Sequence, residues 1–364
     1  MTRQQHLSWQ YLLVLVGLCP SLNPAIAAVP DFTSTDDSLD SGISQSGLPK
    51  QDRGQPGSTI GGGTFNLPET DRGQPESTQG AGKRGGCIPQ SDKGLFRVVL
   101  PVAGDPSLAI ADTISAAPSL WGYVPENDGI VKAEFKLYER NNPNVDVYSL
   151  VIEDLSDKSG LLQVTLPNNT LAANTEYFWD LTFICKGDDR SVDPYVIGSM
   201  TRQNIYQLSI RNEAAVIDSL VAILKGQNSY LTLDAAETSR LAIALESSGN
   251  LPMVEARLRD HLIALQNDYA KLNQSILKLN QNPNINMAEL SLLKAQRSDM
   301  LLELAQLSAF FDLWGDVANF LAMGRADNPA EWNVLLESLF PQDDPTTDEK
   351  EDRLLRLLQT APDL

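Results

Sequence analysis

Cysteine constrains the fold of this chain more than any other residue type, because it occurs only at positions 19, 87 and 185. Cys19 lies in an N-terminal stretch that has the features of an export signal. The other two would remain in an exported chain, where a pair of thiols is typically joined as a disulfide. A Cys87–Cys185 disulfide would tie the start of a β-rich region to one of its later strands, with Cα atoms within ~7 Å. It would also remove both thiols from catalysis and metal binding.

The first 28 residues are typical of a signal peptide. Arg3 supplies a positive charge, residues 11–18 are apolar, and small residues suited to cleavage follow. The apolar run is much shorter than the ~20 residues of a membrane-spanning helix, and no later segment is apolar for long enough. A lipoprotein signal acylated on Cys19 is an alternative, although Leu18 stands where such signals prefer a small residue. We therefore predict a protein without a membrane span, located in the periplasm or outside the cell.

Charge and histidine content exclude several classes of function. The chain has 28 basic and 47 acidic residues, and its formal net charge of −19 disfavours nucleic acids and anionic membrane surfaces as partners. His6 would leave with the signal peptide, so His261 is the single imidazole of the exported chain. Histidine-rich zinc sites and HExxH peptidases need at least two imidazoles. We therefore expect no catalytic residues, no metal site and no cofactor.

Residues 29–90 form a segment of unusual composition. They are rich in Gly, Ser, Thr and Pro and contain few apolar side chains, which predicts a disordered linker. A short repeat occurs at 48–59 and 67–78, around Asp52 and Asp71. The two copies could be docking motifs or the result of duplication inside a linker, and we favour duplication.

Short β-rich runs separated by turn signals fill residues 91–205. The clearest run, 131–140, places apolar side chains on one face and charged ones on the other. Seven such runs at this spacing predict an antiparallel β-sandwich of the immunoglobulin or fibronectin type III kind. The expected strands are 95–100, 120–124, 131–140, 145–155, 161–166, 177–185 and 195–201.

Leu171 and Tyr177 have the spacing of a tyrosine corner, in which a Tyr hydroxyl binds backbone a few residues upstream. The stretch resembles the Leu-x-x-x-Thr-x-Tyr signature of fibronectin type III-like domains. We therefore assign Tyr177 a structural role and not a catalytic one.

The pattern changes to helix after residue 205. A helical connector (206–253) precedes two runs with a heptad spacing of apolar residues, separated by a turn that contains Pro283. These runs predict an antiparallel coiled-coil hairpin over 254–313, with arms of roughly 35–40 Å. Because each arm can bury its apolar stripe against the other, we expect the hairpin to project as a separate arm. Further helices (314–341) and an acidic tail (342–364) with a short helix over 353–359 complete the chain.

Several sequence landmarks follow one another along the chain. They are GKRGGC at 82–87, SLWGYVP at 119–125, VTLP at 164–167, Tyr177 and Trp179, Cys185 with Asp188 and Asp189, LWGDV at 313–317 and WNVLL at 332–336. In order and spacing they resemble the cyanobacterial "domain of unknown function 928" family of exported proteins. The resemblance covers roughly 82–205 well and 309–340 loosely, and about a hundred residues between them look like an insertion. It implies cyanobacterial origin, export and a β-sandwich, but no activity.

Reactive residue types occur, but their context favours structural roles. His261 flanks the seam of the first hairpin helix, where we expect a solvated side chain. Ser275 and Ser291 begin Ser-x-x-Lys motifs inside heptad helices and lack the companion motifs of the enzymes that use them. Trp121 and Trp179 lie in predicted strands, and we expect core packing before a sugar-binding platform.

Acidic residues occur in pairs and in one run. Glu153–Asp154 and Asp188–Asp189 could serve acid–base chemistry, but adjacent carboxylates in turns are usually solvated. The acidic run at 343–352 lacks the ligand spacing of an EF-hand calcium loop.

These observations predict a non-enzymatic exported interaction or adaptor protein of the cell envelope. In this hypothesis the sandwich is a base that presents the helical arm to a protein partner. The alternative is a carbohydrate- or envelope-binding β-sandwich, in which exposed aromatic and carboxylate side chains carry recognition. A carboxylate-based hydrolase is a more distant alternative, and the sequence does not specify an oligomeric state.

Overall fold

The computed structural model describes most of the chain beyond residue 96, and all described residues belong to one compact unit, 54–364. The predicted signal peptide, nearly all of both repeat copies, Asp188 and Asp189, and the start of the acidic run lie outside the described residues. The described residues are 59–60, 63–64, 87, 97–101, 108–127, 129–156, 158–186, 193–210, 213–227, 229–281, 286–339 and 349–362.

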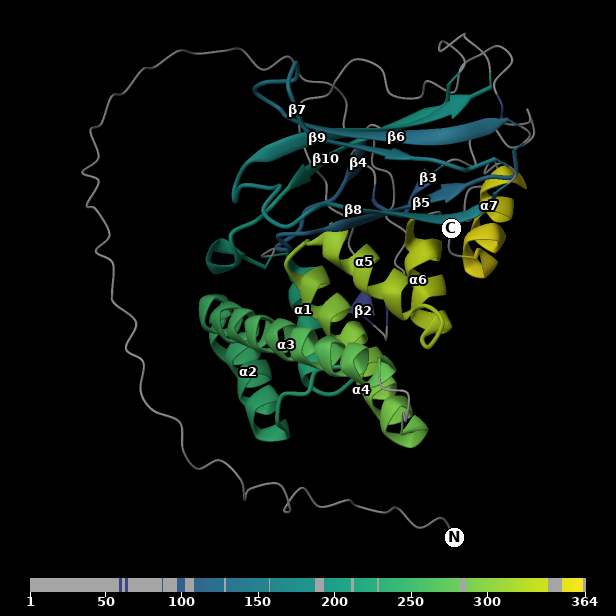
Figure 1. Ribbon diagram of the computed structural model, residues 1–364. Coiled ribbons are helices and arrows are strands. Elements are labelled where there is room, and N and C mark those ends of the chain that lie inside the picture. The colour runs from purple at the N-terminus through teal and green to yellow at the C-terminus, as the bar shows by residue number, and fades with distance from the viewer. Residues whose placement is uncertain are drawn as a thin grey trace, which may run out of the picture. The chain divides into compact units, whose positions relative to one another are not determined.

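The fold is mixed α+β, with a sheet region followed by a helical region (Figure 1). Each of the seven predicted strand segments contains a strand, and the structure has a further short strand, β4, that the sequence pattern does not predict. The strands form a sheet of order β4-β10-β9-β6-β7 and a second sheet of order β3-β5-β8. Their bounds are β3 Arg97–Val98, β4 Leu108–Ile110, β5 Ser119–Val124, β6 Ile130–Glu139, β7 Asp146–Ile152, β8 Gly160–Thr165, β9 Glu176–Cys185 and β10 Tyr195–Thr201.

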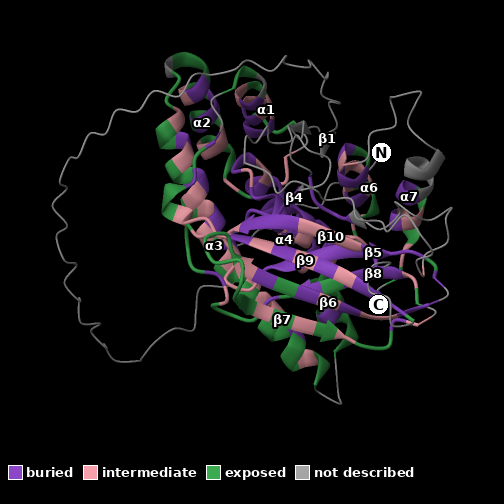
Figure 2. Cartoon of the chain, turned by 90° about the horizontal axis from the view of Figure 1, so that it is seen from above, coloured by how far each residue is buried: buried purple, intermediate pink, exposed green. Residues whose placement is uncertain are grey.

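The prediction of wholly antiparallel pairing is wrong at one edge of the larger sheet. β4 pairs with β10 in parallel, with Leu108 opposite Ile197 and Ile110 opposite Ser199. β4 has only three residues, too few to carry an alternation of apolar and polar side chains that would reveal it. β7 forms the other edge and is largely exposed (Figure 2).

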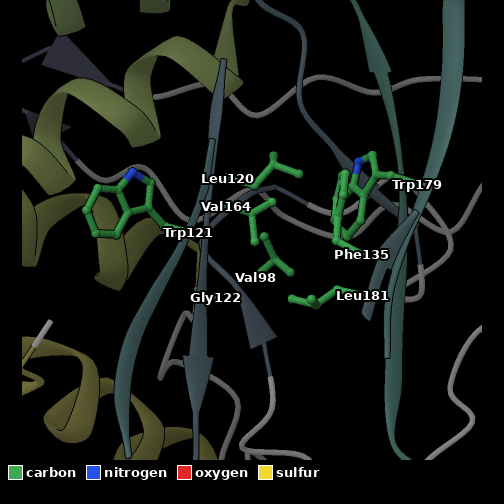
Figure 3. Close-up of a pocket in the computed structure, with 8 residues that line it drawn as sticks. All are labelled: Val98, Leu120, Trp121, Gly122, Phe135, Val164, Trp179 and Leu181. Atoms are coloured by element: carbon green, nitrogen blue, oxygen red, sulfur yellow. The ribbon is translucent and has the colours of Figure 1, made fainter. Parts of the chain in front are cut away.

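The inner faces of the two sheets meet in an apolar core (Figure 3). Phe135, Trp179 and Leu181 come from the larger sheet, while Leu120 and Val164 come from the smaller one. They surround a cavity of about 10 Å³, which is about the size of a single water molecule. A gap of this size between apolar side chains is a packing defect and not a ligand site.

The predicted disulfide is present. Cys87 and Cys185 are joined with an S–S distance of 2.09 Å and a Cα–Cα distance of 5.3 Å. Cys185 is the last residue of β9, so the bond ties the segment before β3 to the centre of the larger sheet.

The tyrosine-corner residues come together at the start of β9. The Tyr177 hydroxyl accepts a hydrogen bond of 2.9 Å from the backbone N–H of Ala172. Both Leu171 and Tyr177 are 1% exposed. This contact fixes the turn before β9 by satisfying a backbone donor.

The helices follow the caps and periodicities of the sequence. Asp234 accepts a hydrogen bond from Glu237 N at the start of α2, Gly249 ends α2 in the left-handed conformation, and Asn286 caps α4. The bounds are η2 Ile205–Gln207, α1 Ala214–Leu224, α2 Ala235–Ser248, α3 Leu251–Asn280, α4 Met287–Phe310, α5 Trp314–Gly324, α6 Pro329–Leu339 and α7 Glu349–Thr360.

The prediction that the hairpin of α3 and α4 buries its apolar stripe only against itself is wrong for one half of the hairpin. This is the half that contains residues 301–308, which we call the lower half. α4 also packs against α5, and α5 packs on β5. Every residue from 301 to 308 is buried. Leucine and alanine occur all around this part of α4, which is typical of a helix covered on every side. The lower half of the hairpin therefore belongs to the core that the helical and sheet regions share.

Part of the predicted disordered linker and the predicted tail helix both contribute to the fold. Thr59–Ile60 (β1) pairs antiparallel with Gly63–Thr64 (β2) inside the predicted linker, and the pair contacts α1 and α6. In α7, Leu354, Leu355 and Leu358 are buried, and the α7 backbone accepts a hydrogen bond from the Trp332 indole. The apolar side chains of α7 recur at helical spacing, so a helix in this acidic tail can still pack on the core.

Gly198 offers a test of the sheet packing. A Cβ at this position would overlap the indole of Trp179 and lie 2.6 Å from Ala109 O. We expect Gly198→Ala to lower the free energy of unfolding by about 1–3 kcal/mol, because a packed core resists added volume. Urea denaturation measures the change. Ser199→Ala is the control, because the Ser199 hydroxyl has no hydrogen-bond partner among the described residues. Equal stability of the two variants would contradict the prediction.

Candidate functional site

Glu303 is the buried carboxylate that organises the helical region. It lies in α4 and is completely buried. Its Oε1 accepts hydrogen bonds from Thr232 N (2.6 Å) and from Thr232 Oγ1 (3.0 Å), and it lies 2.6 Å from His261 Nε2. Its Oε2 has no hydrogen-bond partner among the described residues. One carboxylate oxygen thus connects α3, α4 and the loop before α2.

A second contact ties the same loop to neighbouring helices. Gln306, one turn after Glu303 on α4, accepts a hydrogen bond from Tyr230 N at 3.0 Å. The Tyr230 hydroxyl donates to Glu331 Oε1 on α6 at 2.6 Å. Burial, and then the hydrogen bond to Glu331, raises the pKa of the Tyr230 phenol. We call Tyr230, Thr232, His261, Glu303 and Gln306 the Glu303 cluster.

The expectation that His261 is a solvated flank residue is wrong. Its side chain is only 15% exposed and is paired with Glu303. The two residues lie on different helices, 42 positions apart, so the spacing of residues along either helix does not reveal the pair. A Glu among the leucines of 301–307 was the available signal, because a charge in a run that is apolar all around needs a partner.

The chemistry open to this cluster is limited. A carboxylate that orients an imidazole is a recurring part of catalytic triads, but it acts there on a third, nucleophilic group. The nearby hydroxyl of Thr232 is itself bound to Glu303. The cluster therefore satisfies backbone N–H groups of the loop before α2 and holds this loop against the hairpin of α3 and α4. This is a structural role.

A second buried carboxylate lies where the helical region meets the sheets. Asp316, in the first turn of α5, is 1% exposed. Its Oδ1 accepts from Thr113 Oγ1 at 2.6 Å, and its Oδ2 accepts from Ile114 N at 2.8 Å. The preceding Gly315 donates its N–H to Asp112 O at 2.9 Å. Burial is the largest cause that raises the pKa of Asp316 to about 6. We call the stretches 111–114 and 313–316 the α5 joint.

The same junction explains the position of Trp121. Its ring lies on the face of β5 opposite Leu120 and points away from the core between the sheets (Figure 3). Its indole N–H donates to Asn319 Oδ1 on α5 at 3.2 Å, and the Arg325 guanidinium lies 5.4 Å from the ring centroid. Trp121 is 5% exposed and Trp179 is fully buried, so both are core residues, as expected, and neither is a sugar platform.

The other reactive residues of the sequence analysis are not brought together. Ser275 donates its hydroxyl to Lys271 O within α3, and Ser291 is exposed on α4. Glu153 and Asp154 are exposed, with Asp154 in the left-handed conformation of a turn. In the part of the chain that the structure describes, no three His, Cys, Asp or Glu side chains are placed to hold a metal ion. No described helix combines the length and the apolar character needed to cross a bilayer.

Glu303 can be tested by substitution. We expect Glu303→Ala to lower the free energy of unfolding by about 3–5 kcal/mol, because Thr232 and His261 lose their common acceptor. Glu303→Gln keeps an acceptor oxygen and should cost less. Urea denaturation measures both. In the control Glu246→Ala, an exposed ion pair with Lys225 is lost, which costs about 0–1 kcal/mol. A Glu303→Ala loss no larger than that of the control would refute the structural role.

Comparison with known proteins gives one match. No curated protein and no solved structure matches the chain. Residues 79–230, which include the disulfide, every strand from β3 to β10 and α1, match the model of a family described as Domain of Unknown Function (DUF928). The match ends before the Glu303 cluster is complete and before α5. It supports the resemblance of the sheet region to that family, which is the identification that the comparisons allow.

Proposed function

We propose that the protein is a non-enzymatic exported interaction or adaptor protein of the cell envelope, whose helical arm binds a protein partner. The observation that supports this proposal best is the exposure of the outer half of the hairpin, by which we mean residues 266–281 and 286–300. Leu277, Met287 and Leu292 are 59%, 65% and 60% exposed there. Ile276 and Leu290 are buried, so the end of the hairpin has apolar residues both inside and outside.

Charge indicates the chemistry of the partner. Residues 266–281 and 286–300 carry four basic side chains (Lys271, Lys278, Lys294 and Arg297) against three acidic ones (Asp268, Glu289 and Asp299). The whole chain has a net charge of −19. The outer half of the hairpin is therefore less acidic than the rest of the protein. This favours a partner surface that is acidic as well as apolar.

An exported location is part of this proposal. It is supported by the signal-like composition of residues 1–28 and by the disulfide, because such bonds persist in oxidising compartments. Cyanobacterial origin, a true coiled coil in the hairpin and an immunoglobulin-like sandwich likewise rest on the sequence patterns and on the family resemblance. None of these features requires catalysis.

The arm can be tested with matched surface variants. We expect the triple variant Leu277→Gln, Met287→Gln, Leu292→Gln to lose its partner, because a protein interface depends on a few buried apolar anchors. The measurement is photo-crosslinking from position 278 of the tagged full-length protein in its native cells.

The control variant for the arm is Val145→Thr, Val147→Thr, Val151→Thr. It changes exposed apolar residues at and next to the edge strand β7. A crosslinked product that survives in the arm variant and disappears in the control would place the interface on the sheet and overturn the proposal. Both variants should keep the stability of the parent, because surface substitutions usually change it by less than about 0.5 kcal/mol.

A carbohydrate-binding function remains the second candidate, and the outer face of the larger sheet favours it. Phe135 and Leu137 point into the core, so Tyr138 lies on the opposite face of β6. Its ring lies 6.2 Å from that of Phe178, and the Arg140 guanidinium lies 5.7 Å from the Phe178 centroid.

Polar groups flank these rings. Arg140 pairs with Glu176 at 2.7 Å, and Asp180 stands opposite Lys136 in the register of β6 and β9. Half-buried aromatic rings beside hydrogen-bonding groups are the chemistry that sugar rings require.

A glycan array tests the second candidate. If the outer face binds a sugar, the parent should give a signal that the variant Tyr138→Ala, Phe178→Ala loses, because the stacking surface is removed. Tyr206→Ala, which removes a 76% exposed ring elsewhere, should leave the signal unchanged. Absence of any signal from the parent would dismiss carbohydrate binding and leave the interaction hypothesis as the better one.

A further inference from the structure

The strand β7 is an edge of the larger sheet that lacks the usual protection of an edge. In the order β4-β10-β9-β6-β7 it pairs only with β6, and no other strand of the described residues pairs with it. Residues 148–152 pair with β6 in regular register, and they include no charged residue and no Pro. Native edge strands usually carry charges, Pro or bulges, because an unprotected edge can pair with a strand of another chain.

The apolar layer between the sheets also stays open at this edge. Tyr148, Leu150 and Ile152 lie opposite β6 residues that are fully buried, so they face inward with them. The Tyr148 ring lies 6.4 Å from that of Phe135. These three side chains pack against the core but are only partly buried (Figure 2). The described residues therefore leave an apolar row half-covered along β7.

We propose that β7 pairs antiparallel with β7 of a second copy of this chain, about a two-fold axis at Leu150. The two larger sheets then form one continuous sheet. Leu150 lies opposite Leu150 of the second copy, and Tyr148 lies opposite Ile152. All five residues from 148 to 152 are paired, which adds about 4–6 backbone hydrogen bonds. The contact is self-complementary, as a two-fold interface requires.

The charges on the outer face of the sheet favour this register. With the axis at Leu150, Ser149 lies opposite Val151 of the second copy. The β6 residues next to Ser149 and Val151 are Lys136 and Glu134, so a lysine and a glutamate from different copies share one row across the sheet. An axis at Ser149 would align lysine with lysine, and one at Val151 would align glutamate with glutamate. The two side chains lie roughly 14 Å apart, so charge here selects the register more than it adds affinity.

Long-range charge acts against the dimer. Each copy has a net charge of −19, and acidic residues lie at both ends of the paired stretch, Asp146 at one end and Glu153 and Asp154 at the other. Salt screens this repulsion while it leaves the backbone pairing and the apolar contacts in place. The dimer should therefore become tighter as the salt concentration rises. This inference does not depend on what the arm binds.

The first test measures the mass of the full chain, with its disulfide formed, by sedimentation equilibrium at low and high salt. We expect a monomer–dimer equilibrium that shifts toward dimer in high salt. Leu150→Lys should raise the dissociation constant about tenfold or more, because two lysines would face each other at the axis. An inward-pointing lysine is a device that native edge strands tolerate.

The control is Leu277→Lys, which places the same charge on a 59% exposed residue of the hairpin and should leave the dissociation constant unchanged. A parent that stays monomeric at every concentration and salt would overturn the proposal. So would a dimer that Leu277→Lys dissociates and Leu150→Lys leaves intact, because its contact would then lie on the arm.

Cysteine substitution tests the register, in a chain with Cys19→Ser to remove the other thiol outside the disulfide. Leu150→Cys should crosslink to itself, because residues opposite each other have Cα atoms about 4.5–5.5 Å apart. Ser149→Cys and Val151→Cys should not self-crosslink, since diagonal neighbours lie about 7–8 Å apart, but a mixture of the two should crosslink.

The mixture uses two exposed positions, so it remains informative if Leu150→Cys does not fold. Self-crosslinking at Ser149→Cys or Val151→Cys, without crosslinking in their mixture, would contradict the proposed contact.

Discussion

The structure depends on the need to cover both faces of β5. All six residues of this strand are buried, so its two faces must each pack against another layer. Leu120 faces the larger sheet, and Trp121 faces the helical region (Figure 3). α5 supplies the second cover, α4 packs on α5, and α3 packs on α4. A sheet with one solvated face would not need the helices, whereas this one exposes a large apolar surface without them.

Polar contacts decide how these layers meet. Apolar burial drives α5 onto β5 but has no direction, so it permits many orientations. The hydrogen bonds from Thr113 and Ile114 to Asp316, and from Gly315 to Asp112, are satisfied in one orientation only. Glu303 has the same role between α4 and the loop before α2. Each buried carboxylate contributes specificity of packing at an electrostatic cost.

The hairpin divides into two halves with different physical properties. Its lower half is part of the common core, so removal of the whole hairpin would expose α5 and disturb the sheet contact. Among the described residues of its outer half, 266–281 and 286–300, only Ile276, Leu290 and Ser298 are buried. A partner surface therefore has to be sought on the outer half, where substitutions leave the core intact, and not by deletion of the complete arm.

Much of the local structure was determined by the sequence alone. Alternation along 131–140 predicted a strand, and helical periodicity with the Asp and Asn caps predicted the helices, because these patterns reflect interactions between residues that are close along the chain. The disulfide was predicted for a different reason, because only two cysteines remain after the predicted signal peptide. The sequence did not predict β4, because three residues are too few to show an alternation of apolar and polar side chains. Periodicity also shows that a face is apolar but not which other face covers it. The burial of 301–308, the pairing of His261 with Glu303 and the meeting of Asp316 with Thr113, 203 residues away, were therefore decided only by the tertiary structure.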